Sequence, residues 1–176
     1  DTINVKQARA FLFMCAWSQE FMVDQWIEKG ELSQLSRRKK GLMKDWVLIL
    51  IGPGGTGKTT VLKAFEAVVD HFAGDESVRK CAISKTASRL LGGDTMHALC
   101  KLPRYDLQHR TGKLTSEVLK KHRRRWRTAV ALFVDEISMV APDQLHQTNV
   151  RVQQATGVRN LLFGGLGAVL SGDFLQ

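Results

Sequence analysis

The chain has 176 residues, a net charge of +9 and a hydrophobic content of 44%, which is enough apolar material for one domain with a sizeable core. Its three cysteines are far apart and form no C-x-x-C pair, which argues against a disulfide framework or a cysteine zinc site and favours reduced thiols in an intracellular compartment. No apolar run approaches the length of a membrane span, so no membrane partner is expected, and the basic excess favours nucleic acid as a partner over a soluble basic protein without one.

Residues 1–45 are predicted to form an N-terminal helical segment followed by a basic linker. From Asn4 to Lys29 the apolar residues recur at helical spacing, with Phe13 and Trp17 in one stripe, which is typical of packing against a core. Residues 30–44 are polar and include four consecutive basic residues, which indicates a loop or a short helix leading into the next strand.

A phosphate-binding loop is the most specific signal in the chain. The apolar run Trp46–Ile51 predicts a buried parallel strand, and the apolar spacing within residues 58–72 predicts a helix. Between them the chain matches the pattern G-x-x-x-x-G-K-[ST] at every position. Glycines allow successive N–H groups to converge on a phosphate, and a helix N-terminus adds partial positive charge. The matching residues are Gly52, Pro53, Gly54, Gly55, Thr56, Gly57, Lys58 and Thr59.

This loop indicates ATP and Mg²⁺ as cofactors. Lys58 is expected to reach the β- and γ-phosphates, and the Thr59 hydroxyl is expected to ligate Mg²⁺. The alternative is a glycine-rich turn without a ligand, which the flanking strand and helix disfavour.

Strands and helices alternate through the rest of the chain. Short strands are predicted at 79–83, 130–134 and 168–170, and helices at 86–91, 95–101, 114–126 and 142–154, with a loop at 102–113. This alternation predicts an α/β fold with a parallel sheet flanked by helices. Such a sheet has its ligand site at the carboxyl ends of the strands.

Acidic and polar residues follow two of the predicted strands. We assign Asp135 to the metal and Glu136 to the general base, because acids in this position of phosphate-loop enzymes hold Mg²⁺ and polarise the attacking water. The alternative is a charge pair at a helix N-terminus. Gln176 follows the last strand and is expected to reach the γ-phosphate or the attacking water, the alternative being an Asx turn at Asp173.

The densest positive charge lies at residues 120–127. It is either a solvated face or a surface that neutralises nucleic-acid phosphates. Because the cluster directly precedes the strand at 130–134, we expect it at the amino end of that strand, away from the ATP site. Trp126 is expected to pack against the sheet rather than to stack on bases.

Taken in order, these motifs resemble those of superfamily 1 helicases, most closely the PIF family of 5′-to-3′ DNA helicases, including copies carried by Helitron-type transposons. The resemblance covers most of the chain. It lies in N-x-x-Q-x-x-A-F at 4–11, motif I at 52–60, G-G-x-T-hydrophobic-H at 92–97, D-E-I-S-M-V at 135–140 and G-D-x-x-Q at 172–176. Ile83 and Lys85 stand where the family has Pro and Gly.

The resemblance implies roles for individual residues. It implies a RecA-like ATPase core at 46–176 that carries helicase motifs I to III. Gln7 would contact adenine, and Thr60 would join the nucleotide-binding loop. The implied catalytic residues are Lys58, Glu136 and Gln176, and the implied DNA-binding residues are Ser84, Thr95 and His97.

The implied function is that of an ATP-dependent DNA helicase, in which ATP hydrolysis drives translocation on single-stranded DNA and unwinding at duplex junctions. A second RecA-like domain, which supplies an arginine finger, is expected in cis beyond Gln176. The family resemblance also implies DNA repair, recombination or telomere maintenance, in the nucleus or mitochondrion if the source is a eukaryote. The alternative is a non-catalytic remnant that binds nucleotide and DNA without turnover; a phosphate-loop kinase lacks support.

Overall fold

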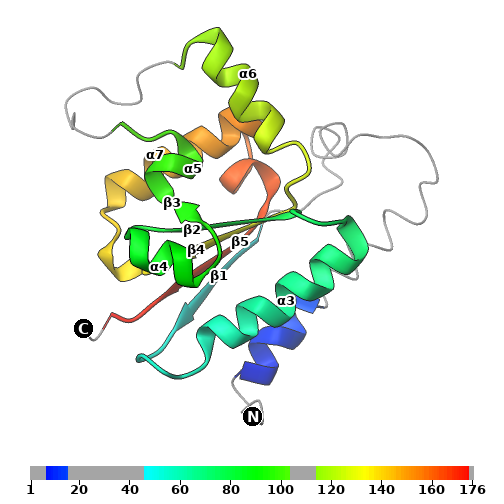
Figure 1. Cartoon of the computed structure of the whole chain (residues 1–176), viewed down its shortest axis with the longest axis vertical. Helices are drawn as coiled ribbons and strands as arrows, with labels where there is room; N and C mark the ends of the chain where they lie inside the picture. The colour runs from blue at the N-terminus through cyan, green and yellow to red at the C-terminus, as the bar shows by residue number, and fades with distance from the viewer. Residues whose placement is uncertain (1–6, 16–45, 104–113, 175–176) are drawn as a thin grey trace.

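In a computed structural model, residues 7–15, 46–103 and 114–174 are described, and they form one parallel sheet with helices on both faces (Figure 1). The strand order is β1-β5-β4-β2-β3. The strands are β1 (Trp46–Ile51), β2 (Val78–Ala82), β3 (Asp94–Thr95), β4 (Ala131–Asp135) and β5 (Gly167–Gly172). The predicted parallel α/β fold is therefore confirmed.

The helices occupy the predicted segments with small shifts at their ends. They are α3 (Lys58–Ala73), α4 (Lys85–Leu90), α5 (Met96–Cys100), α6 (Ser116–Arg125) and α7 (Pro142–Thr156). A short 3₁₀ turn, η1 (Ile137–Met139), follows β4, and a second one, η2 (Leu162–Gly165), precedes β5. None of the helices within the described ranges is long and apolar enough to cross a membrane.

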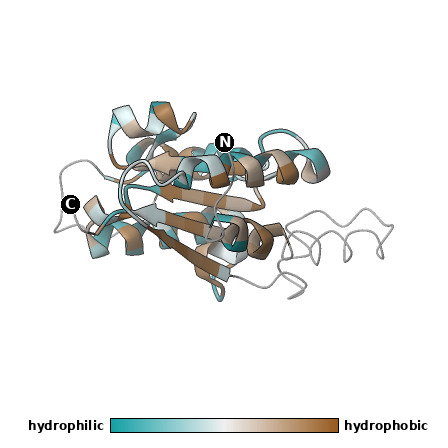
Figure 2. Ribbon diagram, turned by 90° about the horizontal axis from the view of Figure 1, so that it is seen from below, coloured by the Kyte–Doolittle hydropathy of each residue, from teal (hydrophilic) through white to brown (hydrophobic). Residues whose placement is uncertain are grey.

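The central strands divide the core into two layers, because successive side chains of a strand point to opposite faces. Leu132 and Val134 of β4 pack with Trp126 and Val152 on the face that carries α5, α6 and α7. Phe133, between them in sequence, packs on the opposite face with α3 and with Met14. Figure 2 shows the apolar strands lying between the helices of the two layers.

The strand at 46–51 is parallel as predicted, but the interpretation that it is buried is wrong. β1 pairs with β5 and lies at the edge of the sheet formed by the described residues. Its side chains alternate between half-buried and exposed, and Ile49 and Ile51 are 55% and 60% exposed. An unbroken apolar run predicts a strand, but it does not distinguish a central strand from an edge strand.

The described part of the N-terminal segment packs directly on the core. Residues 7–15 are helical, Met14 is fully buried beside α3, and the Phe13 ring meets the Trp46 ring edge-on at 5.9 Å. Trp17 and the basic run at 37–40 lie outside the described residues. The division of the chain at residue 45 stays a prediction.

Candidate nucleotide-binding site

The loop between β1 and α3 holds its backbone in a conformation that glycine adopts readily. Gly55 and Gly57 have φ angles of 77° and 81°, in the left-handed region where a side chain is strained. The Gly57 carbonyl accepts hydrogen bonds from the N–H groups of Thr60 (3.1 Å) and Val61 (3.2 Å), so α3 begins at Lys58. The helix therefore presents its free N–H groups at the loop, an arrangement that binds phosphate.

The Lys58 side chain folds back over this loop. Its Nζ donates hydrogen bonds to the carbonyl oxygens of Gly52 (2.5 Å) and Pro53 (2.9 Å). The ammonium is thus held against the loop, where it can exchange these carbonyls for phosphate oxygens. The start of the loop is also tied to the neighbouring strand, because the Gly52 N–H donates to the Gly172 carbonyl (3.2 Å).

The sheet brings the predicted acidic residues to the same place. Asp135 is the last residue of β4, and Glu136 follows it with a φ angle of 55°. Both line one cavity of about 380 Å³ together with Lys58, Thr59 and Asp173. Parallel strands end at one edge of a sheet, and Figure 1 shows β1 running into the loop that starts α3. The structure therefore places Lys58, Thr59, Asp135 and Glu136 together at this edge, while their roles stay predictions.

The donor set of this cavity suits a magnesium ion that arrives with phosphates. The Thr59 hydroxyl and the Asp135 carboxylate are oxygen donors that line the same cavity, and Mg²⁺ prefers oxygen ligands, with substrate phosphates and water completing its shell. In the described part of the chain, no three His, Cys, Asp or Glu side chains form a cluster able to hold a metal. The Thr59 hydroxyl and the Asp135 carboxylate fit a Mg²⁺ that arrives with the nucleotide.

Gln7 reaches the loop from the N-terminal helical segment. Its side-chain Nε2 donates to the Thr56 carbonyl, and a Cβ atom added at Gly57 would collide with the same Nε2. The side chain is therefore beside the phosphate-binding loop, while the predicted adenine contact stays a prediction.

Two other predicted site residues are less directly defined. Thr60 is exposed in the first turn of α3, and its role in nucleotide binding stays a prediction. Gln176 lies outside the described residues. Gly172, the last residue of β5, and Asp173 after it both line the cavity, so the end of β5 reaches the site.

The three predicted DNA-binding residues lie in two different environments. Ser84 bonds a residue that lines the cavity, because its Oγ donates to Glu136 Oε2 at 3.0 Å. Thr95 lies in the edge strand β3, and its Oγ1 accepts from the Ala98 N–H as the N-cap of α5. His97 is half-buried in the first turn of α5. Sequence reasoning missed the Ser84–Glu136 bond, for which the motif patterns carry no signal.

The basic cluster at 120–127 is partly a structural element. Trp126 is fully buried, which confirms its predicted packing role. His122 is also buried, its Nε2 lies 3.1 Å from the Arg151 carbonyl, and burial lowers its pKa to about 4, so it is neutral at pH 7. Arg125 pairs with Asp94, and its carbonyl accepts from Arg79 Nε at 3.0 Å. The cluster precedes the amino end of β4, as predicted.

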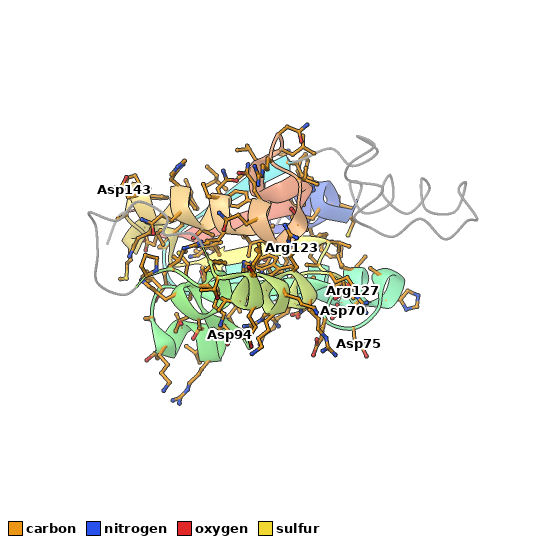
Figure 3. The ribbon with its side chains drawn as sticks, turned by 90° about the horizontal axis from the view of Figure 1, so that it is seen from above. Asp70, Asp75, Asp94, Arg123, Arg127 and Asp143 are labelled. Atoms are coloured by element: carbon orange, nitrogen blue, oxygen red, sulfur yellow. The ribbon has the colours of Figure 1, made fainter. Side chains whose placement is uncertain are left out.

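A second cavity of about 850 Å³ lies beside this cluster, and Figure 3 labels Asp70, Asp75, Asp94 and Arg127 among its lining residues. Arg124 and Arg127 line it together with Asp70, Asp75 and Asp94. Burial, and then the nearby Glu66, raise the pKa of the Asp70 carboxyl. Positive and negative side chains are thus interspersed here, in contrast to a uniformly basic nucleic-acid surface.

Comparison with known proteins identifies the family. A family model described as PIF1-like helicase matches residues 39–176. The chain belongs to the PIF1-like helicase family. Curated relatives within it include the ATP-dependent DNA helicase PIF6 of Trypanosoma brucei brucei, 30% identical over 133 residues, and the ATP-dependent DNA helicase PIF1 of Saccharomyces cerevisiae, 32% identical over 127 residues. The matches cover 73% and 71% of this chain but only 16% and 14% of those proteins.

Solved PIF1-like structures have the same fold. The Pif1 helicase of Candida albicans is 28% identical with a TM-score of 0.57, and the match covers 82% of this chain and 33% of that one. Pif1 from Bacteroides in complex with ADP-AlF3 and ssDNA is 24% identical with a TM-score of 0.58, covering 85% and 33%. The described sheet is therefore the RecA-like fold of these helicases, and the chain spans about a third of each.

Proposed function

We propose that this chain is the ATP-binding domain of an ATP-dependent DNA helicase. The observation that carries the proposal is the convergence of Lys58, Thr59, Asp135 and Glu136 on one cavity at the carboxyl edge of the sheet. Relatives named as ATP-dependent DNA helicases support it. The chain matches a small part of these relatives, so unwinding is proposed for a longer protein that contains this domain.

The residues divide the chemistry between binding and proton transfer. The loop N–H groups and Lys58 bind the triphosphate, and the Thr59 hydroxyl and Asp135 carboxylate would hold Mg²⁺, which offsets phosphate charge when bound. The Glu136 carboxylate accepts a proton from the water that attacks the γ-phosphate. Gln176, four residues after β5 in the sequence, is proposed to link the γ-phosphate to the motion of a second RecA-like domain.

Single-stranded DNA and duplex junctions are the proposed partners. Support comes from the solved Bacteroides Pif1 complex with ssDNA and from the net charge of +9. Ser84, Thr95 and His97 are the proposed contacts. Repair, recombination or telomere maintenance in the nucleus or mitochondrion of a eukaryote is the proposed setting.

Strand separation by the longer protein tests this function. A forked duplex labelled on one strand is mixed with the protein and ATP–Mg²⁺, with Lys58→Ala as the matched inactive variant. We expect ATP-dependent release of the labelled strand by the wild type alone. Binding of nucleotide and DNA without hydrolysis or release would support the non-catalytic remnant, which the substitutions Ile83 and Lys85 in the family's Pro and Gly positions favour.

A further inference from the structure

A hydrogen bond joins the end of β2 to the candidate general base. Ser84 Oγ lies 3.0 Å from Glu136 Oε2, although the two residues are 52 positions apart. The register of the sheet produces this contact. Ala82 at the end of β2 is paired in parallel with Asp135 at the end of β4, so the residues that follow these two strands, including Ser84 and Glu136, leave the sheet side by side.

The direction of the bond follows from what the Ser84 hydroxyl already does. Ser84 is the N-cap of α4, and its Oγ accepts a hydrogen bond from the Ala87 N–H at 3.1 Å. A serine hydroxyl has one proton to donate, and a carboxylate accepts. Ser84 therefore satisfies both neighbours at once, accepting from α4 and donating to Glu136.

The bond from Ser84 orients the Glu136 carboxylate, while other contacts hold the Glu136 backbone. Glu136 has a left-handed φ of 55°, and its carbonyl accepts from the Met139 N–H at 2.9 Å in the turn η1. Within residues 7–15, 46–103 and 114–174, Ser84 is the hydrogen-bond donor that the structure gives to the Glu136 carboxylate. Removing the hydroxyl leaves the hydrogen bond of the Glu136 backbone to Met139 in place, while the Glu136 carboxylate loses this partner.

We propose that Ser84 is a positioning residue, which holds the Glu136 carboxylate in the orientation from which it accepts the proton of the attacking water. The inference rests on the proposed ATP hydrolysis at this cavity. It gives Ser84 a role in the rate of hydrolysis, in addition to the DNA contact that the family resemblance implies. A misplacement of a catalytic group by about 1 Å costs up to about 10²-fold in rate, and we expect a smaller effect because Glu136 itself remains.

The test measures ATP hydrolysis by the full-length protein that contains this domain. Ser84→Ala is expected to lower kcat about tenfold while the KM and the binding affinity for ATP stay within about twofold. Ser84→Thr keeps a hydroxyl that both caps α4 and donates, so it is expected to retain kcat. Ser88→Ala is the matched control. Ser88 is a buried serine of α4 whose Oγ bonds the Lys85 carbonyl at 3.0 Å, and its loss perturbs the same helix without touching Glu136.

A double variant separates positioning from a general loss of structure. If Ser84 acts through Glu136, then Ser84→Ala combined with Glu136→Gln hydrolyses ATP no more slowly than Glu136→Gln alone. Additive losses would overturn the inference, as would a wild-type kcat in Ser84→Ala or an equal loss in Ser84→Ala and Ser84→Thr. If Glu136→Gln hydrolyses at the wild-type rate, Glu136 is not the base, and the inference falls with that part of the proposed function. If Glu136→Gln is inactive and Ser84→Ala is not impaired, the inference alone fails.

Discussion

Replacement of Lys58 by alanine removes a charged contact that the loop already holds in place. Lys58 Nζ bonds the carbonyls of Gly52 and Pro53, so nucleotide binding exchanges these two neutral acceptors for phosphate oxygens. Hydrogen bonds to charged groups contribute about 1.5 to 3 kcal/mol each, roughly twice the neutral value. We therefore expect Lys58→Ala to lose about 3 kcal/mol of binding free energy, which weakens ATP binding about 100-fold.

A titration with a fluorescent ATP analogue in the presence of Mg²⁺ measures this loss. Lys63→Ala is the matched control, because Lys63 is an exposed lysine on the same helix α3 and does not line the cavity. The control is expected to bind like the wild type. Equal affinities of wild type and Lys58→Ala would refute the assignment of residues 52–59 to phosphate binding.

Three further predictions concern the basic cluster. Burial lowers the pKa of His122 to about 4, below its usual value near 6.5, so the unfolded chain binds the proton more readily and stability is lost as the pH falls from about 6.5 to about 4. The pH-dependent part of the free energy of unfolding that comes from His122 is about 3 kcal/mol. Urea unfolding at several pH values should show that it disappears in His122→Gln and remains in His146→Gln, a control at an exposed histidine. Trp126→Ala should destabilise the fold by about 4 kcal/mol in the same assay, whereas loss of less than 1 kcal/mol would contradict its packing role. The double variant Arg124→Ala, Arg127→Ala should leave the salt dependence of oligonucleotide binding by the full-length protein unchanged, because acidic side chains lie among these arginines. If the slope of log K against log salt concentration becomes shallower by about 0.7 for each lost contact, the arginines contact the DNA backbone.

Most of the fold was predictable because the strong signals are local. The loop at 52–59, the strand before it and the helix after it are contiguous, and each pattern names its own structure. The two-residue strand β3 was not predicted, since two residues carry no periodicity. The edge position of β1 was missed because the burial of a strand depends on which strands pair with it. The residues of a strand do not specify its neighbours.

The site was predicted in its parts but not in its connections. Lys58, Thr59, Asp135 and Glu136 were assigned from motifs, and the sheet brings them together as expected. The bond between Ser84 and Glu136 depends on the register of β2 against β4, which no pattern within either segment specifies. The burial of His122 was missed for a similar reason, since a basic run does not show which of its residues faces the core.

Hydrolysis by a Glu136→Gln variant of the longer protein tests the central claim most directly. The substitution preserves size and hydrogen bonding but removes the base, so a single-turnover experiment should show bound ATP at the wild-type level and a hydrolysis rate lower by about 10² to 10⁴-fold. Asp143→Asn, at an exposed acid in the first turn of α7, is the control and should hydrolyse normally. Hydrolysis by Glu136→Gln at the wild-type rate would contradict the assignment of Glu136 as the general base in this cavity.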